Sequence, residues 1–458
     1  MRKWLPPPLR DRIAIIIVLL PTSAASGQTS SAIPTHAGPP TGNPTCQYPS
    51  WSTPVLWPGV KSGSVISWPS LAVGKSGTYI VGNDIAVLDD QPAPSRPLIA
   101  LNLDGASLGK PLRGNFFAFP QAVVDLEGVL HVLWAEPDTT EPISRRDFRS
   151  LWTELKSVWH SAYVPETGWT EAREFYRTAH RIWWQQDLSG AVLDAFGGLH
   201  VAFVDDHGPS ESLVHAVFEQ GKWRIGAVPT SGALTGYSSI AVSPNGEVYI
   251  AYIGPDRSTG RGQNLSTDAN SVFLVHSPNG GRSWNSPSRV SRSGQNQATS
   301  LRALVSPDKK VHLIWGQNLS GGLAAEVLRH VVSDDRGETW SLPDDLDIPD
   351  GARNDLRVAI DEHGTIHVVY GEWFIPDQEQ DRGSERRSLI HAPWDKKWGE
   401  PSSPFPLLNA LDASLASTAD GSIRLFTSAR PNSETSIKPT FKPFTSLLRE
   451  LIDAPCPR

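Results

Sequence analysis

The sequence predicts an all-β protein that forms a single β-propeller. Three observations indicate this fold: a hairpin pattern recurs along the chain, a second strand pair follows most of the hairpins, and the composition favours turns and aromatic packing. The 458 residues include 38 glycines, 39 prolines and 17 tryptophans, which suits many short strands joined by turns.

The recurring hairpin has the form apolar-x-apolar-D/S-x-x-G-x-apolar-H-apolar-x-aromatic. Each copy predicts two short antiparallel strands around a tight turn that Asp, Asn, Pro or Gly residues favour. Seven copies occur, at 71–81, 122–134, 191–203, 240–252, 303–315, 358–370 and 415–426. The first and last copies are weaker, so we expect seven blades, with six as the alternative.

A second unit follows most hairpins and consists of an apolar strand with a histidine, a turn, a tryptophan and a polar strand. Its turns run from His160 to Trp169, His215 to Trp223, His276 to Trp284, His330 to Trp340 and His391 to Trp398. Each blade therefore has four antiparallel strands. Most histidines occupy repeat positions in different blades, so we expect them to pack and hydrogen-bond within the blades rather than to bind a metal.

The two ends of the chain are predicted to share one blade. The last hairpin is followed by one apolar strand at 444–452, and the segment 51–55 matches the fourth-strand pattern without a third strand before it. Cys46 and Cys456 flank these two strands. An exported protein permits a disulfide between them, which would fasten the ring.

The N-terminus predicts export. Residues 1–25 combine basic residues, an eight-residue apolar stretch at 13–20 and small residues, as in a signal peptide. Eight apolar residues are too few to span a hydrocarbon core of about 30 Å, so we expect no permanent membrane anchor. Residues 26–45 predict a flexible linker, which leaves 46–458 for the propeller. We therefore expect a secreted or periplasmic protein.

The bulk charge and the motifs restrict the partners. The formal net charge is −7, which argues against nucleic acid as a ligand. No motif points to a metal or to another cofactor. Strand 1 begins and strand 2 ends on the face of the ring with the long connections, so we expect a ligand site on that face, at the mouth of the channel.

Two arginines give the clearest candidate site. Arg302 and Arg357 stand at one repeat position on the inner strands of adjacent blades, where paired guanidinium groups could hold a carboxylate. Gln121 occupies the same repeat position in another blade. The alternative is that each arginine pairs with a neighbouring acid, such as Asp355 or Asp412.

The segment 333–343 reads S-x-D-x-G-x-T-W-S-x-P, and a weaker copy lies at 277–287. The pattern resembles the Asp-box of the sialidase-like (BNR-repeat) β-propeller superfamily. The resemblance implies a propeller with a carbohydrate-directed site, in which three arginines hold a sugar carboxylate. Arg302 and Arg357 match two of these arginines, and Trp373 would contact the sugar.

The resemblance also implies candidates for catalysis. Sialidases of this superfamily use a Tyr–Glu pair as the nucleophile, because a tyrosine with a pKa near 10 needs a carboxylate neighbour, and an Asp as the acid/base. The candidates are Tyr237 or Tyr370 as nucleophile, Glu372 or Glu136 as its partner, and Asp205 or Asp206 as general acid. We thus expect either an exported sialidase-like glycosidase or a non-catalytic secreted propeller that binds a glycan or a protein.

Overall fold

A computed structural model describes the residues 50–52, 55–56, 64–86, 98–103, 106–108, 119–138, 155–184, 190–207, 211–232, 234, 236–255, 270–291, 298–319, 325–348, 352–374, 386–404, 408–418, 421–431 and 445–452. The predicted signal peptide (1–25), the predicted linker (26–45), Cys46 and Cys456 lie outside these residues. No helix in the described part of the chain is long and apolar enough to cross a membrane.

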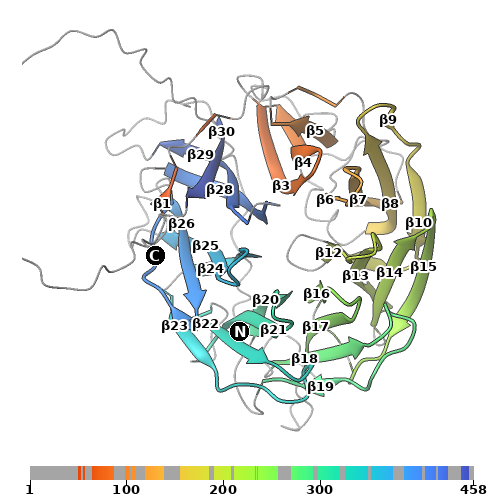
Figure 1. Ribbon diagram of the computed structural model, residues 1–458, viewed down its shortest axis with the longest axis vertical. Helices are drawn as coiled ribbons and strands as arrows, with labels where there is room; N and C mark the ends of the chain where they lie inside the picture. Colours follow the sequence, from red (N-terminus) through yellow and green to blue (C-terminus); the bar gives the residue numbers. More distant parts are fainter. Residues whose placement is uncertain are drawn as a thin grey trace, which may run out of the picture.

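The described strands form seven antiparallel sheets arranged around a ring, which we number in chain order (Figure 1). Sheet 1 contains β3 (Ser64–Gly74), β4 (Gly77–Ala86) and β5 (Leu98–Asn102). Sheet 2 contains β6 (Gln121–Val124), β7 (Leu130–Pro137), β8 (Leu155–Val164), β9 (Gly168–Trp169) and β10 (Arg173–Arg177). Sheet 3 contains β11 (Arg181–Trp183), β12 (Gly190–Leu193), β13 (Leu199–Asp206), β14 (Ser212–Glu219) and β15 (Lys222–Val228).

The remaining sheets complete the ring. Sheet 4 contains β16 (Ser238–Val242), β17 (Val248–Pro255), β18 (Asn270–Ser277) and β19 (Ser288–Arg289). Sheet 5 contains β20 (Ala298–Val305), β21 (Val311–Gln317), β22 (Val327–Ser333) and β23 (Asp344–Asp347). Sheet 6 contains β24 (Ala352–Ile360), β25 (Ile366–Phe374), β26 (Arg386–Asp395) and β27 (Lys397–Trp398). Sheet 7 contains β28 (Leu408–Ser417), β29 (Ile423–Pro431), β30 (Thr445–Ile452), β1 (Ser50–Trp51) and β2 (Val55–Leu56).

One strand of each sheet lies nearest the centre of the ring, and we call these the inner strands: β3, β6, β12, β16, β20, β24 and β28 (Figure 1). Each inner strand contacts the inner strand of the next sheet, and β28 of sheet 7 contacts β3 of sheet 1. Within the described residues, sheet 1 has three strands and the other six sheets have four or five. The prediction of an all-β single propeller with antiparallel blades is confirmed.

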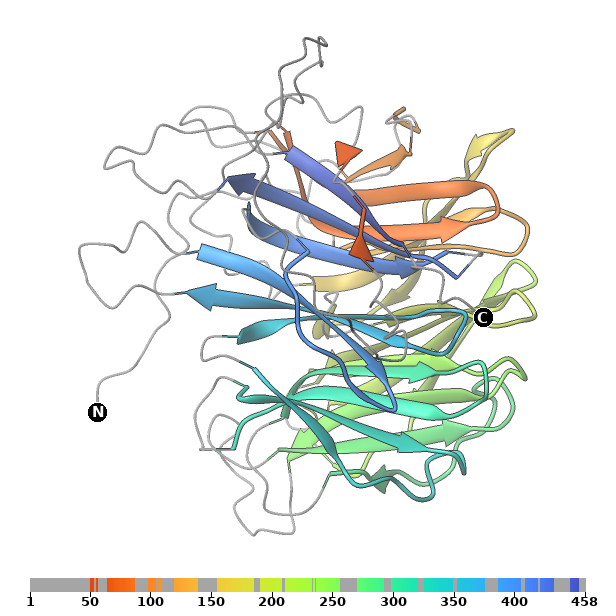
Figure 2. The same ribbon diagram turned by 60° about the vertical axis from the view of Figure 1, so that its left-hand side comes forward.

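Apolar side chains fill the seams between neighbouring sheets. On β13, Val201 and Phe203 pack against sheet 2, whereas Ala202 and Val204 pack against sheet 4. Successive side chains of a strand point to opposite faces, so a strand covered on both faces is apolar at consecutive positions. The sheets therefore lie face to face around the ring, which Figure 2 shows from a different direction.

The repeat histidines form buried pairs inside the sheets, as the sequence predicts. In sheets 2, 3, 5 and 6 the Nδ1 atom of one histidine lies 3.0 to 3.1 Å from Nε2 of the next, in the pairs His131–His160, His200–His215, His312–His330 and His367–His391. Burial lowers the pKa of His160, His215 and His391 from 6.5 to about 3. These three imidazoles are therefore neutral at physiological pH and stabilise the sheets by packing and hydrogen bonding.

The segment 333–343 forms a tight turn after β22. Ser333 Oγ accepts a hydrogen bond of 2.7 Å from the amide of Gly337, and Asp335 Oδ1 accepts one of 2.8 Å from the amide of Thr339. Arg336 and Gly337 have positive φ values of 67° and 88°. The copy at 277–287 repeats the geometry, since Ser277 Oγ binds the amide of Gly281 at 2.8 Å. Both segments serve as structural turns.

The strands at the two ends of the described chain lie in one sheet. β1 and β2 both pair with β30, with Ser50 opposite Ile452 and Val55 opposite Leu448. The amide of Leu71 in sheet 1 donates a hydrogen bond of 2.9 Å to Ser414 Oγ in sheet 7.

Candidate functional site

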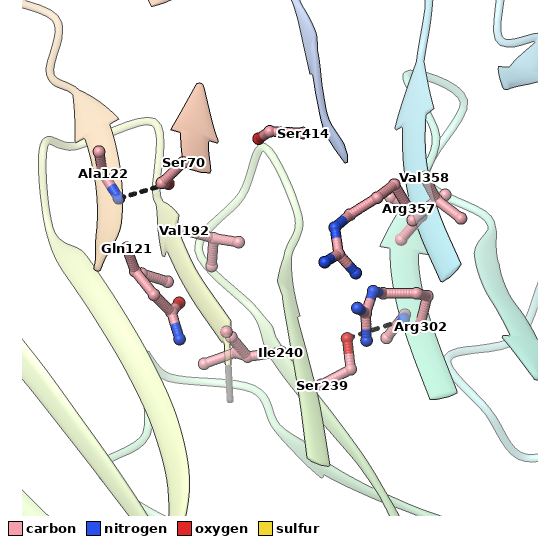
Figure 3. Close-up of a pocket in the computed structure, with 14 residues that line it drawn as sticks. Ser70, Gln121, Ala122, Val192, Ser239, Ile240, Arg302, Arg357, Val358 and Ser414 are labelled. Atoms are coloured by element: carbon pink, nitrogen blue, oxygen red, sulfur yellow. Dashed lines mark hydrogen bonds between the residues drawn. The ribbon is translucent and has the colours of Figure 1, made fainter. Parts of the chain in front are cut away.

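The inner strands enclose a cavity of about 230 Å³ at the centre of the ring (Figure 3). One residue from the same repeat position of each sheet lines it: Ser70, Gln121, Gly190, Ser239, Arg302, Arg357 and Ser414. The sequence repeat thus places Gln121, Arg302 and Arg357 in one cavity. Ser414 also lines the cavity, but it directly precedes the last hairpin copy, which matches the repeat only weakly, so the sequence did not single it out.

The two arginines reach the cavity in the same way. A register shift interrupts the pairing of β20 between Thr299 and Arg302, and an equivalent shift precedes Arg357 on β24. Such bulges redirect the side chains that follow them. At the bulge of β20, Ser300 has a positive φ of 52°. Both guanidinium groups point into the cavity (Figure 3).

Backbone carbonyls orient both guanidinium groups. Arg302 Nη1 donates to the carbonyl of Leu301 at 2.8 Å, and Arg357 Nη1 donates to that of Leu356 at 3.1 Å. Arg357 Nε also donates to the carbonyl of Ala413 in sheet 7, at 2.9 Å. Because both leucines are buried, each arginine is anchored to a rigid part of its strand.

Serines at the same repeat position have a different role. Ser70 Oγ accepts a hydrogen bond of 2.9 Å from the amide of Ala122 in the next sheet, and Ser239 Oγ accepts one of 3.0 Å from the amide of Ala303 (Figure 3). Ser414 binds the amide of Leu71 in the same manner. The serines therefore bridge seams through their hydroxyl groups without adding charge, whereas the arginines bring positive charge to the cavity. Among the described residues that line the cavity, the charged ones are the two arginines.

A glycine at this position reflects close packing. A Cβ atom on Gly190 would lie 3.1 Å from Cγ2 of Ile240 in the next sheet, which is tighter than ordinary van der Waals contact. Gln121 is 7 % exposed.

The tyrosine candidates have different surroundings. Tyr237 lies two residues before Ser239, is half-buried, and packs against the apolar cluster between sheets 4 and 5. Tyr370 is 3 % exposed and belongs to the core between sheets 5 and 6, with Leu356 and Ile366. Of the two, Tyr237 is the one close in sequence to a residue that lines the cavity.

Glu136 and Gln317 occupy equivalent positions near the ends of the second strands of sheets 2 and 5. Glu136 Oε1 accepts a hydrogen bond of 2.8 Å from Trp134 Nε1, and Gln317 Oε1 accepts one of 3.0 Å from Trp315 Nε1. Glu136 thus acts as a structural hydrogen-bond acceptor, and in sheet 5 the side-chain amide of a glutamine has the same role. Glu372 and Trp373 lie on β25, opposite Ser388 and Arg387 of β26, and their side chains are outside the described part of the structure.

Asp205 lies in a polar cluster between sheets 2 and 3. Its side chain is 1 % exposed and accepts hydrogen bonds from Tyr176 Oη at 2.5 Å and from Thr178 Oγ1 at 3.1 Å. Nε2 of the partly exposed His207 lies 3.2 Å from Asp205 Oδ2. Burial and the bond to Asp205 raise the pKa of Tyr176. Asp206 forms an ion pair with Arg181.

Two tryptophans near this cluster pack against other parts of the protein. The guanidinium of Arg181 lies 3.8 Å from the ring centroid of Trp183, and a Cβ atom on Gly236 would lie 3.0 Å from the same ring. Trp184 is fully buried and donates a hydrogen bond of 2.8 Å to the carbonyl of Phe119. Burial keeps Trp184 from contacting a sugar, and the Arg181 guanidinium lies over the ring of Trp183.

No protein-family model and no curated protein matches this sequence. A structure of an ulvan lyase of polysaccharide lyase family PL25 bound to -[GlcA(1-4)Rha3S]- covers 86% of this chain and 95% of its own, with 13% identity and a TM-score of 0.51. A second structure of that lyase gives the same coverage and identity with a TM-score of 0.50. The NanB sialidase from Streptococcus pneumoniae, as its K499G mutant, has 13% identity and a TM-score of 0.37, over 69% of this chain and 55% of its own. The chain shares the β-propeller fold with the ulvan lyase.

Proposed function

We propose that the central cavity binds the carboxylate of an acidic sugar, with Arg302 and Arg357 as the clamp. One observation carries this proposal: two arginines from adjacent inner strands, each held by a carbonyl of its own strand, point into one cavity. Guanidinium groups present several N–H donors in a planar fork that matches a carboxylate. The hydroxyl and amide groups around them suit a polar ligand such as a sugar.

The fold is compatible with such a ligand, since the ulvan lyase with the same fold is bound to -[GlcA(1-4)Rha3S]-. A cavity of about 230 Å³ admits a single sugar residue rather than a buried polymer chain. The sugar that carries the carboxylate would therefore enter the cavity and leave the rest of a glycan outside the ring.

The reaction proposed for this site is hydrolysis of a glycoside, sialosides included. Tyr237 would be the nucleophile, Glu372 its partner, and Trp373 and Gln121 would contact the sugar. Asp205 would act through His207, because its own carboxylate is buried and accepts two hydrogen bonds. Release of the fluorophore from fluorogenic glycosides by the purified protein tests this reaction.

A second function, binding of a glycan or a protein without catalysis, is favoured by the placement of two candidates. Tyr370 belongs to the core and Asp205 is enclosed, so neither reaches a substrate directly. A protein that binds acidic sugars but hydrolyses none of a broad panel of fluorogenic glycosides would have this second function.

The clamp is tested by Arg302→Ala and Arg357→Ala. We expect each variant to bind N-acetylneuraminate or D-glucuronate at least about 10-fold more weakly than the wild type, because each loses hydrogen bonds to a charged group. Isothermal titration calorimetry measures the affinity, and circular dichroism checks the fold. The control is Arg173→Ala, whose side chain is 77% exposed. Wild-type affinity in both clamp variants would exclude the clamp.

We also propose that the ring is seven-bladed, that the chain ends close it and that the protein is exported. The pairing of β1 with β30 and the bond between Leu71 and Ser414 support the closure. A disulfide between Cys46 and Cys456 would reinforce it. Non-reducing peptide mapping of the secreted protein should recover the two cysteines in one linked peptide pair, and two free thiols would rule out this bond.

A further inference from the structure

In three of the seven sheets, the residue after the cavity-lining position has a backbone N–H that faces the preceding sheet. In three seams this N–H binds a serine hydroxyl: Ala122 to Ser70, Ala303 to Ser239 and Leu71 to Ser414. The bonds measure 2.9 to 3.0 Å and connect equivalent atoms each time. The same hydrogen bond therefore recurs at three seams of the ring, where one sheet supplies the N–H and the sheet before it supplies the acceptor.

Val358 occupies the same position in sheet 6. Arg302 is opposite Ile314 and Ala303 opposite Leu313 in sheet 5, whereas Arg357 is opposite Val369 and Val358 opposite Val368 in sheet 6. N–H groups alternate between the two edges of an antiparallel strand. The Val358 N–H therefore points away from β25, as the Ala303 N–H points away from β21.

The residue across this seam is Arg302 rather than a serine. A guanidinium group has five N–H donors and no acceptor, so it cannot accept a hydrogen bond from the Val358 amide. Val358 lines the cavity beside both arginines and is half-buried, which leaves its strand edge within reach of a ligand. The seam between sheets 5 and 6 thus brings a backbone donor to the same space as two cationic side chains.

We infer that the backbone amide of Val358 is a third donor for the carboxylate, beside Arg302 and Arg357. The inference rests on the proposed function of the cavity and adds where in it the carboxylate lies. One carboxylate oxygen accepts from the Val358 N–H, and the ligand lies against the seam between sheets 5 and 6. Sheets 1, 4 and 7 have a serine at the position that Arg302 occupies in sheet 5. The arginine adds positive charge and leaves the Val358 N–H accessible to the ligand.

The direct test removes the N–H with Val358→Pro. Proline lacks the donor and is tolerated on an edge strand whose N–H faces away from its partner. The matched control is Ile240→Pro, at the same repeat position of sheet 4, opposite Ile250 and next to Gly190. We expect Val358→Pro to weaken binding of D-glucuronate at least about 10-fold by calorimetry, because a hydrogen bond to a charged group is lost. Ile240→Pro should change the affinity less than about 2-fold.

A second test does not depend on a proline. Arg302→Ser recreates the serine found at positions 239 and 414, so its hydroxyl should accept from the Val358 amide, whereas Arg302→Ala leaves that amide without a side-chain acceptor. We expect the serine variant to have the higher midpoint of thermal unfolding. Equal midpoints would overturn the inferred direction of the Val358 N–H.

The outcomes separate the inference from the proposed function. A wild-type protein that binds neither D-glucuronate nor N-acetylneuraminate overturns the proposed function and this inference with it. A wild-type protein that binds, loses affinity on Arg302→Ala and Arg357→Ala, but has equal affinities in Val358→Pro and Ile240→Pro retains the clamp and overturns the third donor.

Discussion

The buried carboxylate of Asp205 can be interpreted as a general acid or as a structural hydrogen-bond acceptor. It accepts hydrogen bonds from Tyr176 and Thr178, and its side chain is 1 % exposed. Asp205→Ala should lower the free energy of unfolding by about 2–3 kcal/mol, since two partly buried donors lose their acceptor. Urea denaturation measures this change, with the exposed Asp308→Ala as the control. A change of less than about 0.5 kcal/mol would refute the structural role.

At the level of the element, the turn at 333–343 depends on one glycine. Gly337 has a φ of 88°, and an added Cβ atom would lie 2.3 Å from Cδ2 of the buried Leu274. Gly197 has a φ of 85° and nothing within 4 Å of an added Cβ. Both alanine substitutions pay the left-handed strain of about 1–2 kcal/mol, and Gly337→Ala adds overpacking of about 1–3 kcal/mol. Chemical denaturation should therefore give a clearly lower free energy of unfolding for Gly337→Ala than for Gly197→Ala. Equal values would contradict the crowding argument.

At the level of the whole molecule, the neutral histidines make the ring sensitive to acid. The pKa values of His160, His215 and His391 fall from 6.5 to about 3 on burial, so the unfolded chain binds protons that the folded protein excludes. The contribution of these three histidines to stability is fully present above pH 6.5 and is lost as the pH falls towards 3. At pH 5 each of these imidazoles lowers the free energy of unfolding by about 2 kcal/mol relative to neutral pH. The midpoint of thermal unfolding should drop markedly between pH 7.5 and pH 5, and an unchanged midpoint would refute the assignment.

Repetition explains why the ring and the arginine pair were predictable. The hairpin copies at 303–315 and 358–370 align Arg302 with Arg357, and the inner strands β20 and β24 place both at the cavity. Equivalent sequence positions have equivalent positions in space once the fold repeats around an axis.

Contacts between individual side chains were not predictable, because no repeat pattern states which groups meet a given side chain. Trp184 is fully buried and donates a hydrogen bond to the carbonyl of Phe119, which no repeat position indicates. Glu136 was a catalytic candidate, but it accepts the indole N–H of Trp134. The only sequence signal for this role is the parallel between Trp134–Glu136 and Trp315–Gln317, which becomes meaningful once the bonds are seen.

The serine bridges limit how such a site can evolve. An arginine that replaces Ser70, Ser239 or Ser414 would add a cation to the cavity and remove a bond between neighbouring sheets. The loss matters most at Ser414, whose partner Leu71 lies 343 residues away in the chain. Selection for more charge at the centre of the ring therefore opposes selection for its cohesion, and lineages that gain cations should retain serine at position 414 the longest.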